Sequence, residues 1–391
     1  MTVLPDLVCR DCDRTYPVSS LAWRCGCGGL FDVSDFTPAH DPGGPSAGDG
    51  SLWRFGDVLP VPVDRRISLG EGSTPLVTSL VDSDVVLKCD FLMPTSSFKD
   101  RGAVILATMA ARLGVRAAIV DSSGNAGTAA AAYFARAGIP IQVFVPASTS
   151  PGKLAQMVAH HADVTLVPGD RRACADAALA AADEPGLLYA SHVYHPYFLH
   201  GVKTYGYEIW EQLGRRVPET VVVPVGNGTL VLGCHLAFAE LKAQGLIPQV
   251  PRIIAVQTSS CAPLAAAWAA GRPGIDEVRS TPTVAEGIAI SAPPRAAQIL
   301  AAVRETGGAI VNVDDRQTLQ AQADLAAQGL YVEPTAAVCY AAVQQARRSA
   351  SAGRPTRADA DGFAALRSGE LVVPLCGSGL KTPGSPPGAA R

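Results

Sequence analysis

The chain has 391 residues, with 32 lysines and arginines against 35 aspartates and glutamates and a net charge of −3. A charge this close to balance provides no basic field for nucleic acid, so we expect a small, near-neutral substrate. No apolar run is long enough to span a bilayer, and the first residues lack the pattern of a secretory signal. We therefore expect a soluble, cytoplasmic protein without membrane or nucleic-acid partners.

Four cysteines gather near the amino terminus in two closely spaced pairs, Cys9 with Cys12 and Cys25 with Cys27. This spacing predicts a zinc-ribbon-like segment over residues 1–38, in which four thiolates surround one structural zinc ion. The second pair is Cys-x-Cys and not the commoner Cys-x-x-Cys, so a metal-free ribbon is the alternative. A disulfide is the weaker alternative in a cytosolic chain.

The rest of the chain alternates β-branched runs with alanine-rich stretches. Residues 39–50 are rich in glycine and proline and predict a linker. The alternation after it predicts α/β architecture with mostly parallel sheets, extensive enough for two such layers. The expected strands cover 117–120, 141–145, 221–225 and 253–256, and the expected helices lie near 126–137 and 152–161. The composition of 349–362 predicts a surface loop, and that of 382–391 a disordered tail.

Lys99 is the most informative single residue, in the segment Ser97-Phe98-Lys99-Asp100-Arg101-Gly102. A lysine amine is protonated and unreactive near its usual pKa of about 10.4, so a lysine that condenses with an aldehyde needs a special site. Small hydroxyl and turn residues around Lys99 indicate such a site. A solvated lysine at the start of a helix is the alternative.

Two glycine-bearing turns follow expected strands. Ser122-Ser123-Gly124-Asn125-Ala126 leads into a helix whose first amides favour an anion such as a substrate carboxylate. Gly226-Asn227-Gly228-Thr229 leads into another, where a glycine backbone can wrap a phosphate. Either turn, taken alone, could serve packing only.

The order of these motifs, followed by Leu375-Cys376-Gly377-Ser378-Gly379-Leu380-Lys381, resembles the threonine synthase family of fold-type-II pyridoxal-phosphate enzymes. The segment Glu71-Gly72-Ser73-Thr74-Pro75-Leu76 also matches that family. The resemblance implies a tryptophan-synthase-β-like fold with two open twisted α/β domains behind the ribbon, and commonly a homodimer. The large, cofactor-binding domain would comprise 51–100 and 205–381, and the small domain 101–204.

The resemblance also implies roles for the matching residues. Lys99 would hold pyridoxal 5′-phosphate and act as acid and base, and Asn125 would contact the cofactor's 3′-oxygen. The substrate carboxylate would bind at Ser122, Ser123 and Gly124. The phosphate would bind at Gly226, Asn227, Gly228 and Thr229, and Cys376 would face the pyridine nitrogen, where the family usually places a threonine hydroxyl.

Departures from the family pattern concern the substrate. An asparagine, a serine and an arginine that help bind the phosphate of O-phosphohomoserine are replaced by His192, Val193 and Phe198. Ala126 stands where many members have a threonine that assists late steps. His192, His195 and His200 have a spacing that fits no common zinc motif, so we interpret them as structural or, for His192 and His195, as substrate-recognition residues.

These observations favour a pyridoxal-phosphate lyase or synthase acting at the β or γ carbon of an amino acid other than O-phosphohomoserine. One alternative is a genuine threonine synthase whose phosphate contacts lie elsewhere. Another is a non-catalytic binding or regulatory relative, although the retention of Lys99, Asn125 and the glycine turn together speaks against it.

Overall fold

The computed structural model describes residues 4–38, 50–149, 151–169, 171–351 and 362–381. The linker expected over 39–50, except Gly50, the tail expected over 382–391 and most of the loop expected over 349–362 lie outside the described residues. Packing contacts group the chain into unit 1, Met1–Ser73 with Met93–Thr204, and unit 2, Thr74–Leu92 with Tyr205–Arg391. The domain boundaries expected from the sequence stay a prediction; the contact grouping differs from them in joining 51–73 and 93–100 to unit 1.

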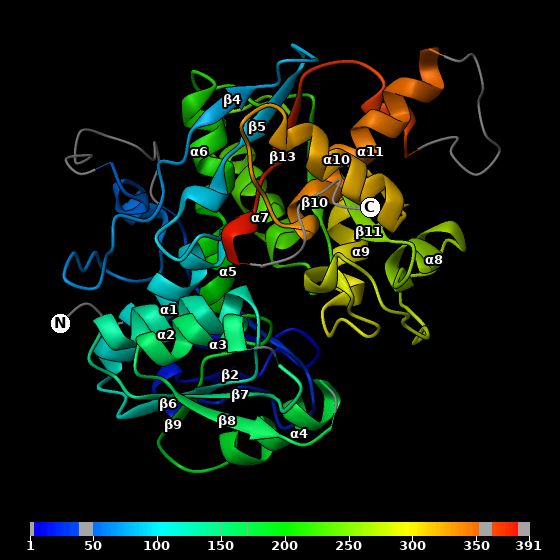
Figure 1. Ribbon diagram of the computed structural model, residues 1–391. Helices are drawn as coiled ribbons and strands as arrows, with labels where there is room; N and C mark the ends of the chain where they lie inside the picture. The colour runs from blue at the N-terminus through cyan, green and yellow to red at the C-terminus, as the bar shows by residue number, and fades with distance from the viewer. Residues whose placement is uncertain (1–3, 39–49, 150, 170, 352–361, 382–391) are drawn as a thin grey trace. The chain divides into compact units, whose positions relative to one another are not determined.

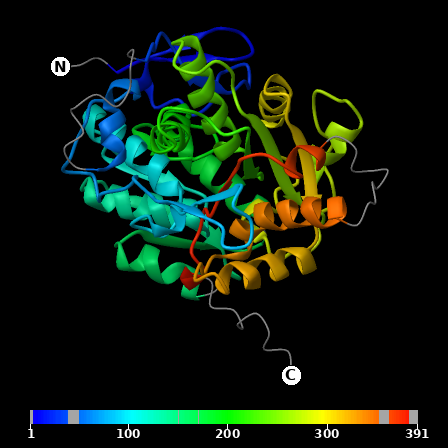
Figure 2. The ribbon, with the colours of Figure 1, turned by 90° about the horizontal axis from the view of Figure 1, so that it is seen from above.

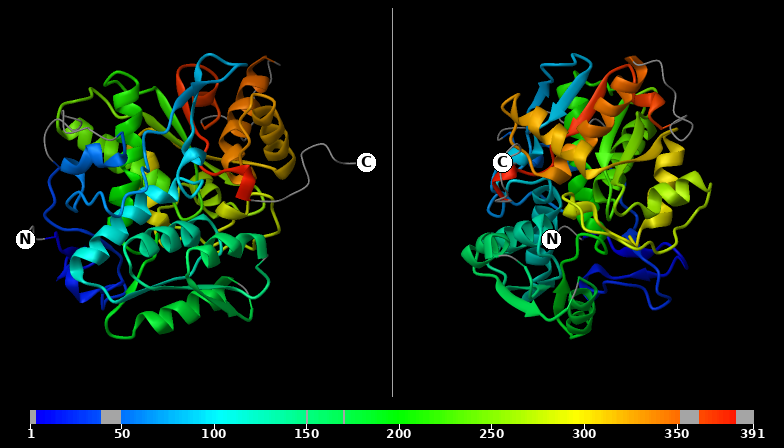
Figure 3. Two further views of the ribbon diagram at one scale, coloured as in Figure 1. Left: turned by 60° about the vertical axis from the view of Figure 1, so that its left-hand side comes forward. Right: turned by 45° about the vertical axis from the view of Figure 1, so that its right-hand side comes forward.

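Unit 1 begins with the ribbon, residues 4–38, which is the dark blue segment in Figure 3. Its three antiparallel strands have the order β2-β1-β3, and a short 3₁₀ helix, η1, follows β2. The bounds are β1 Leu7–Cys9, β2 Thr15–Tyr16, η1 Val18–Ser20 and β3 Phe31–Val33. Strands this short bury little apolar surface, so the ribbon needs further support to stay folded.

The main part of unit 1 is a parallel four-stranded sheet with the order β8-β7-β6-β9. In Figure 1, α1, α2 and α3 cover one face of this sheet and α4 covers the other. The strands are β6 Ala117–Val120, β7 Ile141–Pro146, β8 Asp163–Val167 and β9 Leu187–Tyr189. The helices are η2 Leu52–Val58, α1 Lys99–Leu113, α2 Asn125–Arg136, α3 Pro151–Ala159, α4 Arg171–Ala182 and α5 Pro196–Val202.

Unit 2 contains a six-stranded sheet with the order β12-β11-β10-β13-β5-β4, parallel except for the β4–β5 pair. Helices α10 and α11 pack side by side on one face, and α7 and α9 on the other (Figure 2). The strands are β4 Leu76–Thr78, β5 Val85–Lys88, β10 Thr220–Pro224, β11 Arg252–Thr258, β12 Ala309–Val313 and β13 Leu371–Pro374. The helices are η3 Asp90–Leu92, α6 Thr204–Gln212, α7 Thr229–Ala243, α8 Pro263–Ala269, η4 Glu286–Ile288, α9 Ala296–Glu305, α10 Asp315–Ala326, α11 Pro334–Ser351, η5 Ala364–Leu366 and η6 Gly379–Lys381.

The predicted α/β class and the predicted elements are confirmed. The four expected strands are β6, β7, β10 and β11, and the two expected helices are α2 and α3. Central strands such as β10 are buried along their whole length, as a parallel sheet covered on both faces requires. Within the described residues, every helix is too short or too polar to cross a membrane.

Helix α1, which begins at Lys99, lies unusually close to α5. A Cβ atom on Gly201 of α5 would lie 2.1 Å from the backbone oxygen of Arg101 and 2.7 Å from the Cα atom of Gly102. A Cβ atom on Gly102 would in turn lie 2.4 Å from the ring of Phe198. Glycine at both positions therefore lets the two helices approach to backbone contact.

Replacing Gly201 with alanine tests this contact. The obstructing atoms belong to the backbone of α1, so the helices must separate, and overpacking of this kind destabilises a protein by about 1–3 kcal/mol. We expect Gly201→Ala to lower the midpoint of thermal unfolding by several degrees, at about 2–4 °C per kcal/mol for large domains. Gly274→Ala is the matched control, because a Cβ atom there meets nothing within 4 Å. Equal midpoints for the two variants would refute the close contact.

Candidate active site

Lys99 is the first residue of α1 and is half-buried, with its amine 4.2 Å from the centre of the Phe98 ring. The turn before the helix is fixed by Asp100, which is fully buried. Its carboxylate accepts hydrogen bonds from the backbone amide of Thr95, at 2.7 Å, and from the Thr95 hydroxyl. These bonds close the Met93–Lys99 turn and fix the backbone on which Lys99 is carried.

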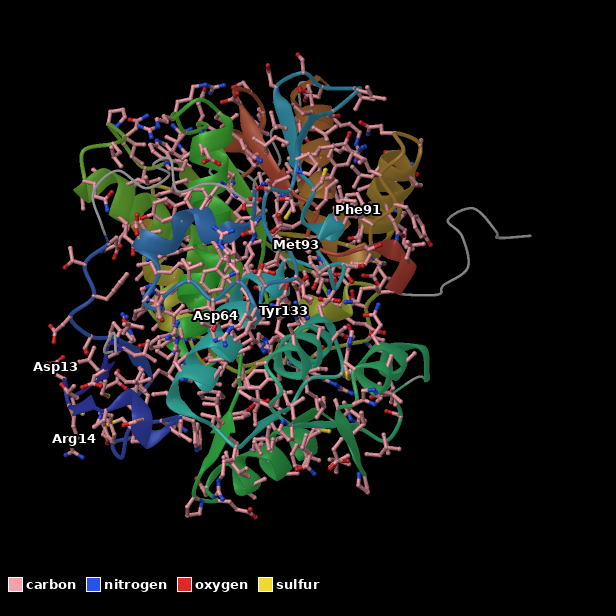
Figure 4. All side chains as sticks on the ribbon, turned by 90° about the vertical axis from the view of Figure 1, so that its left-hand side faces the viewer. Asp13, Arg14, Asp64, Phe91, Met93 and Tyr133 are labelled. Carbon is pink, nitrogen blue, oxygen red and sulfur yellow. The ribbon has the colours of Figure 1, made fainter. Side chains whose placement is uncertain are left out.

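A buried polar group beneath this turn was not predicted from the sequence. The Tyr133 hydroxyl, on α2, donates a hydrogen bond to the Glu71 carboxylate at 3.0 Å (Figure 4). Burial raises the pKa of Glu71, and burial with the nearby Asp100 and Glu71 carboxylates raises the pKa of Tyr133 well above 10. The Arg101 guanidinium, also buried, donates to the Thr204 hydroxyl at 3.1 Å. Glu71 was part of the motif noted in the sequence, but nothing local to it indicated Tyr133 as its partner.

The expected carboxylate-binding turn links β6 to α2. Ser122 and Ala126 are buried, Ser123 and Asn125 are half-buried, and Gly124 is exposed. A Cβ atom on Gly124 would meet nothing within 4 Å, so open space lies beside the start of α2. First-turn amides have no partners within their own helix, and with open space before them they suit a carboxylate.

The substituted segment lies just before and within α5. His192 is 8% exposed, and its ring meets the ring of Phe198 edge-on, with 5.9 Å between centres. Burial, and secondly the positive charge of Lys99, lower the pKa of His192 well below 6.5. His192 is therefore neutral at pH 7. Phe198 is 2% exposed and packs against Gly102 of α1.

The expected phosphate turn of unit 2 connects β10 to α7. Gly228 caps α7 with φ = +80°, a backbone conformation that favours glycine. Gly226, also fully buried, passes so close to the 286–288 turn that a Cβ atom on it would lie 2.9 Å from the Cα atom of Ile288. Thr229 opens the helix. A turn with this backbone shape at a helix start fits a phosphate group.

Cys376 follows β13 and is 2% exposed. The next residue, Gly377, accepts a hydrogen bond from the Glu333 amide at 3.0 Å, and the Glu333 carboxylate lies where a Cβ atom on Gly377 would be. Two residues beyond Glu333, the Thr335 hydroxyl accepts a bond from the Gly287 amide at 3.2 Å. These contacts link the Cys376 turn to the 286–288 turn, and they were not predicted.

Cys9, Cys12, Cys25 and Cys27 come together at the tip of the ribbon. Their sulfur atoms all lie within 4.8 Å of one another, with 3.5 Å between Cys9 and Cys27 and 3.6 Å between Cys12 and Cys25. Zinc–sulfur bonds of about 2.3 Å in a tetrahedron require sulfur separations of about 3.8 Å, so the four thiols fit one zinc ion. Backbone amides donate to two of the sulfurs, Cys9 and Cys27, both at 3.4 Å. Asp13 and Arg14 project outward beside the cluster (Figure 4).

The expected residues thus fall into two groups. Unit 1 carries Lys99, the Ser122–Ala126 turn, His192 and Phe198, and unit 2 carries the Gly226–Thr229 turn and Cys376. Within unit 1, His192 lies close enough to Lys99 and Phe198 to interact with both. Within unit 2, the glycine turn and the Cys376 turn are joined through residues 286–288 and 333–335.

The lowered pKa of His192 gives a prediction for stability. Because the folded pKa lies below the unfolded value of about 6.5, the unfolded chain takes up a proton first as the pH falls, and stability decreases. One histidine contributes at most about 1.4 kcal/mol per pH unit. We expect His192→Asn to reduce the loss of unfolding free energy between pH 6.5 and 5, measured by urea titration. His161→Asn, at an exposed position, is the control, and a slope for His192→Asn equal to that of the wild type would contradict the prediction.

Comparison with known proteins identifies the family. The pyridoxal-phosphate dependent enzyme family matches residues 67–357. The threonine synthase of Methanosarcina acetivorans is 33% identical over 353 residues, covering 87% of this chain and 86% of that protein. The threonine synthase of Methanocaldococcus jannaschii is 31% identical over 388 residues, covering 96% and 92%.

Solved structures agree in fold. The crystal structure of a threonine deaminase from the organism abbreviated T.th. has a TM-score of 0.62 at 26% identity, covering 78% of this chain and 92% of that chain. The processed form of threonine deaminase isoform 2 from Solanum lycopersicum has a TM-score of 0.66, covering 88% and 93%; at 21% identity it supports the fold alone. This chain is therefore a fold-type-II member of the pyridoxal-phosphate dependent enzymes and belongs to the threonine synthase family.

Proposed function

We propose that the protein uses pyridoxal 5′-phosphate, held by Lys99, to catalyse elimination or replacement at the β or γ carbon of an amino acid other than O-phosphohomoserine. The family supports the cofactor and the reaction class. The substrate proposal rests on one observation, the burial of the Phe198 ring against Gly102 in the segment where the resemblance expects an arginine.

Phenylalanine cannot replace arginine at a phosphate. An arginine offers a planar set of charged donors, whereas the Phe198 ring has none and is packed into the interior of unit 1. His192 does not compensate, because a neutral imidazole is a weak partner for a phosphate. Loss of one such charged contact typically costs about 2–5 kcal/mol in binding. A substrate without a phosphate group is thus the better match.

Each part of the site has a separate task in this proposal. The bound cofactor supplies an electron sink for the substrate. The Lys99 amine removes and returns the proton at the substrate's α-carbon, while the Ser122–Gly124 turn binds the carboxylate. Asn125 contacts the cofactor's 3′-oxygen, and Gly226, Asn227, Gly228 and Thr229 bind its phosphate. Cys376 offers the ring nitrogen only a weak hydrogen bond, because a thiol is a poor donor and acceptor.

A genuine threonine synthase is the second candidate, and Arg171 is the observation that favours it. Arg171 begins α4, is exposed, and contributes to the lowered pKa of His192 after burial and Lys99. A guanidinium in this neighbourhood could supply the phosphate contact that Phe198 cannot. The two candidates therefore differ in what Arg171 does.

We further infer that the four ribbon cysteines hold a structural zinc ion and that the protein is a homodimer. Zinc is supported by the sulfur separations and by the two amide-to-sulfur hydrogen bonds. The dimer is supported by the family resemblance alone. Metal analysis and light scattering of the purified protein test the two inferences separately.

The cofactor proposal is tested by Lys99→Ala. The wild-type holoprotein should show the visible or near-ultraviolet absorbance of lysine-bound pyridoxal phosphate. We expect the variant to lose this band and to lose at least about 10³-fold in turnover, since a covalent attachment and an acid–base group are both removed. Lys242→Ala, at an exposed lysine on α7, is the control and should keep both. A colourless wild-type protein that cannot be reconstituted would instead favour the non-catalytic relative.

The substrate proposal is tested by offering O-phosphohomoserine and a panel of amino acids with other leaving groups. We expect spectral change and turnover with an amino acid that lacks phosphate, and poor binding of O-phosphohomoserine. Efficient threonine formation that falls at least about 10-fold in kcat/KM in Arg171→Gln would establish the second candidate. Efficient threonine formation independent of Arg171 would refute both accounts of the phosphate site.

A further inference from the structure

The ribbon contacts the substituted segment at points spread along α5. The Tyr197 hydroxyl, in the first turn of α5, donates a hydrogen bond to the backbone oxygen of Pro5 at 2.5 Å. Near the end of α5, the rings of His200 and Phe36 meet edge-on with 5.6 Å between centres. The Lys203 amine then lies 5.1 Å from the centre of the Phe36 ring.

Trp23 makes the largest of these contacts, before α5 begins. Its ring meets Tyr194 edge-on at 5.3 Å and Tyr189 of β9 at 5.8 Å. Its indole nitrogen donates to the Asp183 carboxylate at 3.3 Å. Trp23 lies two residues before Cys25, so the metal-binding loop itself carries the side chain that contacts the 189–194 stretch.

The opposite contact of α5 is with α1. Gly201 touches the backbone at Arg101, and Phe198 packs on Gly102. The same short helix thus has the ribbon as one neighbour and the helix that carries Lys99 as another. Seven residues with two neighbours of this kind have little freedom to move independently of either.

The ribbon depends on its thiol cluster for order. Its strands have three, two and three residues, and buried Leu7, Cys9 and Phe31 form much of its interior. A segment this small usually needs a metal to fold, and the metal's binding energy then becomes folding energy. Whether Pro5, Trp23 and Phe36 are held in place therefore depends on the metal.

We propose that the metal-loaded ribbon is a positioning element for the substrate side of the site. Through Pro5, Trp23 and Phe36 it orders residues 192–203, and it thereby raises affinity for the amino-acid substrate without taking part in cofactor attachment. The substrate part rests on the proposed function, because it takes His192 and Phe198 as substrate-facing. Trp23 is the principal positioning residue.

The test uses the holoenzyme and three variants: Trp23→Ala, Trp23→Phe and Trp268→Ala. Trp268 is the matched control, a half-buried tryptophan on α8 of unit 2. Four quantities are measured for each: zinc content, cofactor absorbance, hydrogen exchange of the peptide covering 192–203, and kcat and KM for the substrate found in the panel.

We expect Trp23→Ala to keep zinc and the cofactor band, while amide exchange in 192–203 rises at least about 10-fold through local opening. KM should rise about 10-fold with kcat within about 3-fold, the pattern of lost substrate binding. Trp23→Phe should restore most of both effects, because it keeps an aromatic ring. Trp268→Ala should match the wild type in exchange and KM. Cys27→Ser, which removes one exposed thiol, should lose zinc and reproduce the Trp23→Ala pattern.

Unchanged exchange in both Trp23→Ala and zinc-free Cys27→Ser would overturn the proposal, since the ribbon would then not order α5. Increased exchange with unchanged KM would also overturn it, because the ordering would not reach the substrate. A wild-type protein without cofactor absorbance would refute the proposed function and, with it, the substrate part. The exchange measurement would still decide whether the ribbon orders 192–203.

Discussion

The glycine-mediated approach of α5 to α1 is the constraint on which the rest of unit 1 depends. Gly102 and Gly201 remove the side chains that would otherwise hold the two helices apart, and Phe198 fills the space beside Gly102. Lys99 therefore begins a helix whose position is tied to the 192–203 segment. A change in that segment affects the surroundings of Lys99 directly, because packed interiors transmit displacements of well under an ångström.

The buried polar groups around this contact explain how the turn before Lys99 stays fixed. Asp100 closes the turn, and Glu71 and Tyr133 connect a segment before α1 to α2. Buried charged groups are tolerated only when hydrogen bonds satisfy them. Each of these side chains then has one favourable arrangement, which limits motion at the start of α1. The half-buried Lys99 thus lies on a rigid support.

The sequence predicted the parts of this arrangement that are local. Strands β6, β7, β10 and β11 follow from β-branched runs next to glycine turns, and the cysteine spacing correctly predicted a cluster of four thiols. The contacts between distant segments could not be predicted in this way. Trp23 and Asp183 are 160 residues apart, and Glu71 and Tyr133 are 62 apart. Nothing in the local pattern of either residue specifies its partner, because the tertiary packing of the elements decides which surfaces meet.

The central claim is that Lys99 is the residue that holds the cofactor, and borohydride reduction of the holoprotein tests it most directly. Reduction fixes the cofactor covalently to the lysine amine that carries it, and peptide mapping by mass spectrometry then locates the adduct. The account predicts a pyridoxyl-phosphate adduct on the peptide containing Lys99, at close to one per chain. An adduct on another lysine, or none in a protein that binds the cofactor, would contradict it.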